Sequence, residues 1–404
     1  TDTYRQPGST FKPLAVYGPA INDLGLTLAD TYVDQAITYE NTNRPVKNAY
    51  SGYRGTMTIR DALKYSCNTI AVQCFRDVTP RLGYTYLKDL GFEKVTDHEI
   101  INGQVFDDAR EPTALGGITN GVSTLELTAA YAAIANGGTY TKPVFYTKIL
   151  DQNGDVVLKN KPKTAEVFRE STAYLLTSAL ESVVNDEGGT GNGLKLDNMP
   201  VAGKTGTTSA TRDVWFAGFT PYYTCAVWGG YDDNKECDYD TSFRFRLWKG
   251  IMSRIHENLE EKDFKVPSSV ERKSICTITG KLAGSGCPSI TEYFAKDTLP
   301  AETCSGHGYS YGSKSNSSTE DDSSSNANTS GSSTREDGSN SATGNTTGNT
   351  TAGSDTTGGT TTGGSTGGTT GGSTGGSTGG TTGGSTGGST GGTTGGSTES
   401  TTPQ

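Results

Sequence analysis

The sequence predicts an α+β fold with α/β-type layers, in which helices come first, a group of strands follows and one more helix closes the domain. Three observations indicate this order: an apolar helix signature within residues 113–140, three strand-like segments within 199–230, and a helical apolar pattern over 242–260. Elements segregated along the chain in this way are typical of folds in which helices pack on a sheet.

The clearest helical signal lies within residues 113–140, after a first third that indicates short helices joined by long loops. Ser123 and Glu126 have the spacing of a capping box, in which each side chain satisfies a backbone N–H group of the other residue. The residues that follow are apolar on nearly all sides, so this helix should be buried. Gly137 and Gly138 should end it, because glycine readily adopts the left-handed conformation found at helix ends.

Residues 164–184 have the spacing of a longer amphipathic helix, which two glycines follow. The pattern then changes to short aromatic and β-branched segments, which we predict to be strands: 199–205, 213–220 and 223–230. Pro221-Tyr222 separates the last two segments, so we expect a hairpin there. The final helix is predicted over 242–260.

Composition divides the 404 residues into three parts. Residues 1–265 contain the elements above and are numerous enough to bury a core. Residues 266–307 form a loop-rich segment with three cysteines. Residues 308–404 are almost entirely Gly, Ser, Thr, Asn and Asp, so they have too little apolar surface to offset the entropy cost of ordering. We predict that they form a disordered tail.

Charge and hydropathy exclude some classes of partner. The net charge is −10 and no cluster of Lys and Arg stands out, which argues against a nucleic acid partner. The sequence contains no signal peptide and no apolar run long enough to span a membrane.

Three short motifs carry the chemistry. In chain order they are Ser9-Thr10-Phe11-Lys12, Ser66-Cys67-Asn68 and Lys204-Thr205-Gly206. Each alone is weak, because a serine three residues before a lysine usually lies on a solvated helix face. Together and in this order they match the S-x-x-K, S-x-N and K-T-G set of the serine β-lactamases and penicillin-binding proteins.

The first motif supplies a nucleophile and a base. Serine is a poor nucleophile until a base takes its proton, and residues three apart share one face of a helix. We therefore expect Lys12 to place its amine beside the Ser9 hydroxyl. Lysine normally titrates near about 10.4, so burial and a second cation, Lys204, should lower the pKa of Lys12. Pro7-Gly8 suits a sharp entry into this helix, and Pro13 is tolerated only in its opening turn.

The second motif is expected to lie in an extended loop, where residues two apart point the same way. Ser66 is then placed to relay a proton to the leaving group and Asn68 to hold a substrate amide. A polar loop without a catalytic role would be the simpler interpretation if this motif stood alone.

The third motif ends an apolar strand. Gly206 should leave room for a substrate backbone to pair with the strand edge. Lys204, Thr205 and Thr207 are candidates for binding a carboxylate. The backbone N–H groups of Ser9 and Thr207 would form the oxyanion hole.

The surrounding sequence resembles the transpeptidase domain of class A, bifunctional penicillin-binding proteins. The resemblance covers roughly residues 1–260 and is carried by these segments: Gln6 to Pro13, Arg60 to Asn68, Leu115 to Gly138, Ala202 to Thr208 and Asp213 to Pro221. It implies an antiparallel sheet of five strands with helices on both faces. It also implies that D-Ala-D-Ala stem peptides acylate Ser9, that a neighbouring stem-peptide amine resolves the acyl-enzyme, and that penicillins bind Ser9 covalently.

The same resemblance implies features that we expect to lie outside this sequence: two first strands of the sheet, a glycosyltransferase domain and an N-terminal membrane anchor. The implied partners are peptidoglycan stem peptides, lipid-linked glycan strands and β-lactams. The implied location is the extracytoplasmic face of a bacterial cell membrane, reached only through that anchor.

Two rival functions remain open. The same acyl-enzyme could be hydrolysed, as in a D,D-carboxypeptidase or a β-lactamase, although the Glu-x-x-Leu-Asn loop of class A β-lactamases is not found. A non-catalytic binding module is the other, and the intact residues of all three motifs argue against it.

Cysteine usage gives a weaker signal. The chain has seven cysteines, so at least one is unpaired or bonded to another chain. Cys276, Cys287, Cys304 and His307 match a zinc ligand set by residue type, but their spacing matches no compact zinc motif. We therefore favour a disulfide there, and we predict neither a metal nor a cofactor.

Overall fold

The computed structural model describes residues 3–307. The tail predicted at 308–404 lies outside these residues and stays a prediction. The helices are α1 (Gly18–Asp23), α2 (Ile59–Lys64), α3 (Asn68–Val78), α4 (Pro80–Asp89), α5 (Thr124–Ala135), α6 (Glu170–Asn185) and α7 (Phe243–His256). None of the helices in the described part is long and apolar enough to cross a membrane.

The central sheet is antiparallel, with the strand order β11 (Ala202–Thr207), β12 (Asp213–Phe219) and β13 (Thr224–Gly230). The three strands predicted from the sequence are therefore confirmed, including the hairpin between the last two. The resemblance implied five strands, and the described residues contribute three to this sheet. β11 is at one edge of it, which leaves one side of the K-T-G strand without a neighbouring strand in the described chain.

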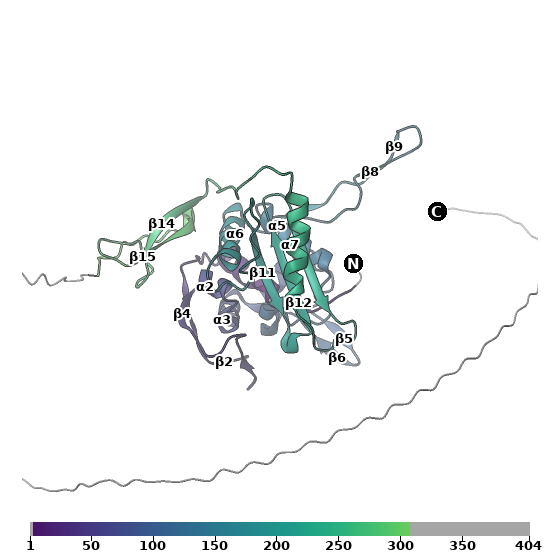
Figure 1. Ribbon diagram of the computed structural model, residues 1–404. Coiled ribbons are helices and arrows are strands. Elements are labelled where there is room, and N and C mark those ends of the chain that lie inside the picture. Colours follow the sequence, from purple (N-terminus) through teal and green to yellow (C-terminus); the bar gives the residue numbers. More distant parts are fainter. Residues whose placement is uncertain (1–2, 308–404) are drawn as a thin grey trace, which may run out of the picture. The chain divides into compact units, whose positions relative to one another are not determined.

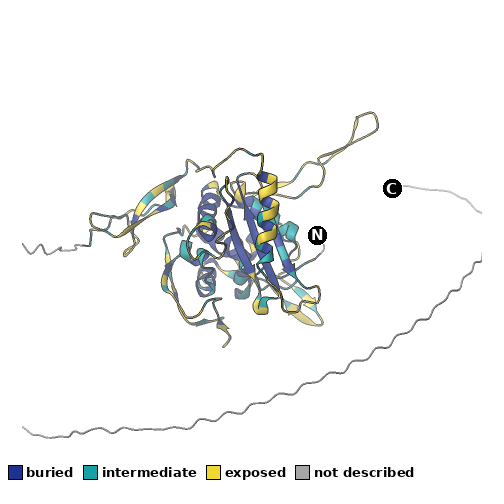
Figure 2. Ribbon diagram, viewed as in Figure 1, coloured by how far each residue is buried: buried dark blue, intermediate teal, exposed yellow. Residues whose placement is uncertain are grey.

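Helices cover both faces of this sheet, as predicted (Figure 1). Side chains alternate along β12 because successive residues of a strand point to opposite faces. Trp215 and Phe219 pack into one core with residues of α5 and α6, whereas Phe216 packs into a second core with Trp248 of α7. The Phe216 and Trp248 rings meet edge to face, with centroids 5.0 Å apart. Figure 2 shows the buried sheet between these layers and the exposed side of α7.

Two helix predictions have different outcomes. The capping box of Ser123 and Glu126 is present at the start of α5, and the helix ends before Gly137, as predicted. The helix predicted over 164–184 is wrong at its start, because residues 164–166 form β10 (Thr164–Glu166) and pair with β7 (Thr139–Thr141). α6 is also buried rather than amphipathic, since β11, α2, α5 and β15 (Ser289–Ala295) all pack against it.

The remaining strands form small two-stranded sheets around the domain. They pair as β1 (Thr31–Asp34) with β4 (Gly55–Thr58), β2 (Ile37–Thr38) with β3 (Pro45–Val46), β5 (Glu99–Ile101) with β6 (Gln104–Phe106), β8 (Lys148–Leu150) with β9 (Val156–Lys159), and β14 (Val270–Cys276) with β15. Sequence analysis predicted none of these strands, because most are only two to four residues long and have few or no buried side chains.

The β14–β15 hairpin is tied to the helical core by a buried ion pair. Glu292 of β15 accepts two hydrogen bonds from the Arg60 guanidinium, both at 2.6 Å. Arg60 lies in α2 and also donates to Ser178 and Ser182 of α6. Burial opposes the charge of Arg60, but the bonds to Glu292 raise its pKa above the ordinary value. The hairpin therefore braces the helix that leads into the S-x-N motif.

Candidate active site

The S-x-x-K motif lies in a tightly wound segment rather than in a regular α-helix. Gly8–Phe11 form a 3₁₀ turn, and the chain continues from Lys12 to Tyr17 as a π-helix before α1 begins. The predicted sharp entry is confirmed, because Gly8 has a φ of 57°. A Cβ atom at Gly8 would lie only 2.9 Å from the carbonyl oxygen of Thr207. Glycine is therefore needed here both for its conformation and for close contact with β11.

Lys12 is fully buried and points to the second motif. Its Nζ atom is 2.6 Å from the Ser66 carbonyl oxygen, 3.2 Å from Ser66 Oγ and 2.7 Å from Asn68 Oδ1. The expected contact with Ser9 is not among its hydrogen bonds within residues 3–307, because the amine is directed to Ser66 and Asn68 instead. Burial lowers the pKa of Lys12 to about 7, although the nearby Cys67 thiol acts in the opposite direction.

Ser66 joins the two lysines of the motifs. Its Oγ lies 3.2 Å from Lys12 Nζ and 2.8 Å from Lys204 Nζ, so the two amines are at most about 6.0 Å apart (3.2 + 2.8). The expected extended loop is wrong, because Ser66 has a φ of 55° and ends the turn between α2 and α3. The pKa of Lys204 is lowered by burial first and then by the charge of Lys12. This confirms that the lysines are close, and it makes burial the main cause of their low pKa values.

Asn68 is the first residue of α3, and residues that the sequence analysis missed hold it in place. Its backbone N–H donates to Asn48 Oδ1 at 2.7 Å, and its side-chain amide donates to the Lys47 carbonyl oxygen at 2.6 Å. Asn48 is held in turn by Asp34, with 2.8 Å between Asn48 Nδ2 and Asp34 Oδ1. No sequence motif marks Asn48 or Asp34, since both act through contacts formed only in the folded chain.

Asp34, which holds Asn48 and through it Asn68, is almost fully buried. Burial would raise the pKa of its carboxyl group, but four hydrogen bonds outweigh this effect and hold the pKa below its ordinary value. The donors lie at 2.6 to 2.8 Å: Thr69 Oγ1, Asn48 Nδ2, Tyr50 Oη and the backbone N–H of Arg54. A carboxylate that accepts several hydrogen bonds is favoured in its charged form, so Asp34 fixes the start of α3.

The K-T-G strand lies directly against the nucleophile segment. A Cβ atom at Gly206 would lie 2.6 Å from the Pro7 carbonyl oxygen and 2.9 Å from Thr10 Cγ2. A side chain at Gly206 would therefore clash with the nucleophile segment, whereas pairing of a substrate backbone with the edge of β11 that has no neighbouring strand in the described residues stays a prediction. Thr205 Oγ1 lies 2.8 Å from Thr190 Oγ1, and Thr207 is exposed at the end of the strand.

These elements surround a cleft of about 870 Å³. Of the predicted site residues, Ser9, Asn68 and Thr207 line it, while the others lie buried behind its wall. The lining also includes four cationic side chains: Arg44, Lys47, Arg110 and Arg212. Its one acidic residue, Asp213, is paired with Arg5 at 2.9 Å. The cleft therefore offers a serine hydroxyl, buried amines behind it and a positively charged border.

Comparisons with known proteins agree with this geometry. Residues 1–244 match the penicillin binding protein transpeptidase domain family, and residues 266–309 match the penicillin-binding protein 1A C-terminal domain family. The chain is 35% identical over 333 residues to penicillin-binding protein 1A of Clostridium tetani, which covers 76% of this chain and 40% of that protein. It is 36% identical over 289 residues to penicillin-binding protein 1F of Bacillus subtilis, covering 68% of this chain and 38% of that protein. The chain thus spans about two fifths of these curated relatives.

Solved structures share the fold. The crystal structure of penicillin-binding protein 1A from Haemophilus influenzae aligns with a TM-score of 0.64 at 26% identity, over 75% of this chain and 50% of that chain. PonA1 from Mycobacterium tuberculosis aligns with a TM-score of 0.56 at 24% identity, over 66% of this chain and 72% of that chain, which supports the fold alone. The family match covers more than half of the chain, and the fold agrees with it. This chain belongs to the penicillin-binding protein transpeptidase family.

Proposed function

We propose that this chain is a serine D,D-transpeptidase that cross-links peptidoglycan through an acyl-enzyme on Ser9. The observation that carries the proposal is the pair of buried amines, Lys12 and Lys204, that share the Ser66 hydroxyl behind the cleft that Ser9 lines. Buried amines with low pKa values are the groups that a serine nucleophile needs beside it.

Lys12 is the base in this proposal. Near neutral pH about half of its amine is uncharged, because its pKa is about 7. A neutral amine has two N–H donors, which match the two shortest contacts of Lys12, to the Ser66 carbonyl oxygen and to Asn68 Oδ1. Its lone pair then remains to accept a proton. As Ser9 Oγ attacks the D-Ala-D-Ala carbonyl, a rotation of either side chain brings the Ser9 proton to Lys12.

Ser66 completes the proton path. When the bond to the terminal D-alanine breaks, the leaving amine needs a proton; the Ser66 hydroxyl can supply it and take back from Lys12 the proton that Lys12 received from Ser9. The carbonyl carbon is then bonded to Ser9 Oγ, and free D-alanine departs. Reversal of these steps lets the amine of a second stem peptide attack the acyl-enzyme and form the cross-link.

The cleft supplies substrate binding. Asn68 reaches the cleft from α3 and is held firmly enough to orient a substrate amide. Thr207, together with Lys204 and Thr205 behind it, is suited to the substrate carboxylate, and the cationic border of the cleft attracts anionic peptides. The backbone N–H groups of Ser9 and Thr207 would stabilise the oxyanion, since Gly8 already lies against Thr207.

The proposal also covers the substrates, the inhibitors and the cellular location. Stem peptides on lipid-linked glycan strands are the substrates, and β-lactams are covalent inhibitors that occupy the same cleft. The corresponding location is the extracytoplasmic face of a bacterial cell membrane. We assign no glycosyltransferase activity to these residues.

A donor–acceptor assay tests the proposal. The protein is incubated with a synthetic stem pentapeptide ending in D-Ala-D-Ala and with an acceptor amine, and the products are separated by liquid chromatography and mass spectrometry. We expect D-alanine release together with a cross-linked product. Ser9→Ala should abolish both, whereas Ser209→Ala, which changes another serine of the cleft lining, should have little effect.

The rivals give different products. D-Alanine release without cross-linked product would indicate a carboxypeptidase, and rapid turnover of a β-lactam would indicate a β-lactamase. A folded protein that releases nothing and binds no β-lactam covalently would support the non-catalytic binding module.

A further inference from the structure

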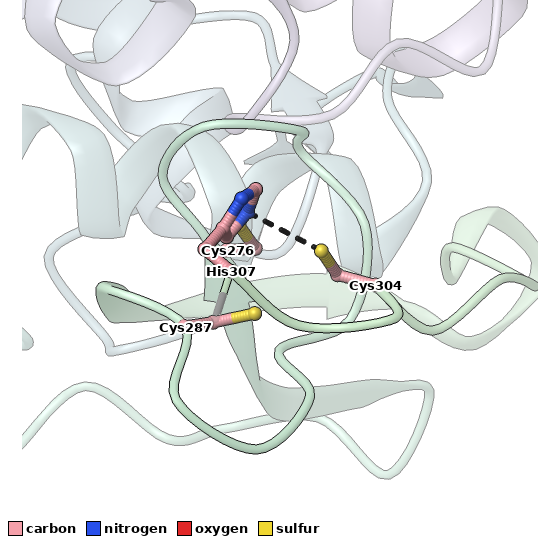
Figure 3. Close-up of side chains that lie close together, drawn as sticks. All are labelled: Cys276, Cys287, Cys304 and His307. Atoms are coloured by element: carbon pink, nitrogen blue, oxygen red, sulfur yellow. Dashed lines mark hydrogen bonds between the residues drawn. The ribbon is translucent and has the colours of Figure 1, made fainter. Parts of the chain in front are cut away.

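The segment that follows the transpeptidase region brings four metal-binding side chains together. Cys276 ends β14, Cys287 lies just before β15, and Cys304 and His307 follow the hairpin. Their ligand atoms all lie within 4.8 Å of one another. His307 Nε2 is 3.1 Å from Cys276 Sγ and 3.4 Å from Cys304 Sγ. Figure 3 shows the four side chains close together, with a dashed line from the His307 ring to the Cys304 sulfur.

The backbone is built to hold this cluster. The N–H group of Cys276 donates to the Lys281 carbonyl oxygen, and that of Cys304 donates to the Leu282 carbonyl oxygen, both at 2.8 Å. The turn after Cys276 is thereby tied to the segment that carries Cys304. A Cβ atom at Gly284 would lie 2.1 Å from the Cys304 carbonyl oxygen, so only glycine allows the loop of Cys287 to approach this closely.

The separations suit one tetrahedral ion. With Zn–S bonds of about 2.3 Å and Zn–N bonds of about 2.0 to 2.1 Å, tetrahedral angles place two sulfurs about 3.8 Å apart and a sulfur and a nitrogen about 3.6 Å apart. The distances from His307 Nε2 to the sulfurs of Cys276 and Cys304, 3.1 and 3.4 Å, lie slightly below the second value, and the widest separation between ligand atoms is at most 4.8 Å. Closing the four groups onto one ion therefore needs movements of about 1 Å or less.

The disulfide favoured by the sequence analysis fits the cluster less well. All three cysteines are free in the structure. A disulfide would use two of them and leave the third thiol and the imidazole without a role, whereas a metal ion uses all four groups. A disulfide also requires an oxidant, whereas zinc binding requires only that the thiols lose their protons.

The segment also needs a stabilising link at the turn end of the β14–β15 hairpin, where the four side chains lie. Residues 277–288 are mostly exposed, and the buried apolar residue nearest to the cluster is Ile275. The other fully buried apolar side chains of the segment, such as Phe294, lie toward the opposite end of the hairpin, next to α6. Units of about 40 residues or fewer rarely bury enough apolar surface to hold together without a metal or disulfide.

We propose that Cys276, Cys287, Cys304 and His307 form a structural zinc site. Three thiolates and one neutral imidazole complete the four positions of the ion, so no position is left open for a substrate, which is typical of structural rather than catalytic zinc. Each thiol releases its proton to solvent on binding, so one ion displaces three protons and no electrons are transferred. The site holds together the end of β14, the loop before β15 and the irregular stretch that carries Cys304 and His307.

Metal analysis of the whole chain tests this proposal. The protein is purified with a thiol reductant, reconstituted with zinc chloride, passed over a desalting column and measured by plasma mass spectrometry. We expect about one zinc per chain, with X-ray absorption showing three sulfurs at about 2.3 Å and one nitrogen at about 2.0 to 2.1 Å. Cys276→Ser and His307→Ala should each lower the retained zinc at least tenfold. Their matched controls, Cys237→Ser and His98→Ala, should retain it, because both residues lie outside the cluster.

A second measurement keeps the proposal testable if the ligand variants fold poorly. Removing zinc from the unaltered chain with a chelator should increase proteolysis within residues 266–307, and added zinc should reverse this. The proposal is overturned if the reduced, reconstituted chain retains no zinc, if the ligand variants retain it, or if the chain holds a disulfide among these cysteines and no metal. Iron bound by the same four residues would overturn the choice of zinc. None of these results depends on the activity of Ser9.

Discussion

The pH dependence of Ser9 acylation follows directly from the environment of Lys12. The perturbation is pH alone, from about 5.5 to 9.5, with the second-order rate of acylation by a penicillin as the readout. A pKa of about 7 for Lys12 means that about 9% of the amine is neutral at pH 6 and about 91% at pH 8. Because the base must be neutral to accept a proton, acylation should rise with pH, by about tenfold between these values, and then level off.

The size of the rise distinguishes a buried lysine from an ordinary one. A lysine with a pKa near 10.4 would give an increase of about a hundredfold from pH 6 to pH 8, and the rate would keep rising above pH 8. The assay measures competition with a fluorescent penicillin under conditions where the inhibitor's carboxylate stays ionised. Circular dichroism at each pH confirms that the protein is folded.

Two results would refute the reasoning. A rate that climbs tenfold per pH unit past pH 8 would mean that the structure does not lower the pKa of Lys12. A rate that does not change with pH would mean that no group with a pKa near 7 acts as the base.

Three further predictions concern the supports of the site. Ser66→Ala removes the oxygen shared by both lysines and should slow acylation by about 10²- to 10⁴-fold; a loss below threefold in the same assay would contradict the proton relay. Glu292→Ala leaves the Arg60 guanidinium without its buried partner and should lower the free energy of unfolding by about 3 to 5 kcal/mol in urea denaturation, whereas Glu271→Ala breaks a more exposed pair and should change the free energy of unfolding far less. Gly206→Ala would push β11 away from Pro7 and should slow acylation by about 10²-fold, whereas Gly250→Ala has open space around it and should leave acylation unchanged.

The central sheet and its covering helices could be predicted because their signals are local. Strand β12 is marked by a run of aromatic and β-branched residues, and α5 by its capping box. The start of α6 could not be placed, since residues 164–166 join β10 only through pairing with β7, which lies more than 20 residues earlier. For such short segments, tertiary pairing decides between strand and helix.

The motif residues were identified from sequence, but their mutual geometry was not. An α-helical alignment was assumed for Ser9 and Lys12, whereas the chain there winds as a 3₁₀ turn and then a π-helix. The groups that Lys12 contacts belong to Ser66 and Asn68, more than 50 residues away. Local spacing carries no information about contacts of this kind.

The grouping of Cys276, Cys287, Cys304 and His307 also could not be predicted from local sequence spacing. Compact zinc motifs are recognised by ligands paired at short spacing. Here the four residues come from the end of β14, the loop before β15 and the stretch after the hairpin, and only Cys304 and His307 are close in sequence. The hairpin and the turn after Cys276 bring them together.

The central claim is that Ser9 is the nucleophile of this transpeptidase domain. The most direct test is to incubate the protein and its Ser9→Ala variant with benzylpenicillin, measure intact mass and map the modified peptide. The account predicts one stable penicilloyl group, located on Ser9, and no adduct on the variant. An adduct on another residue, an adduct that persists in Ser9→Ala, or a folded protein that forms none would contradict it.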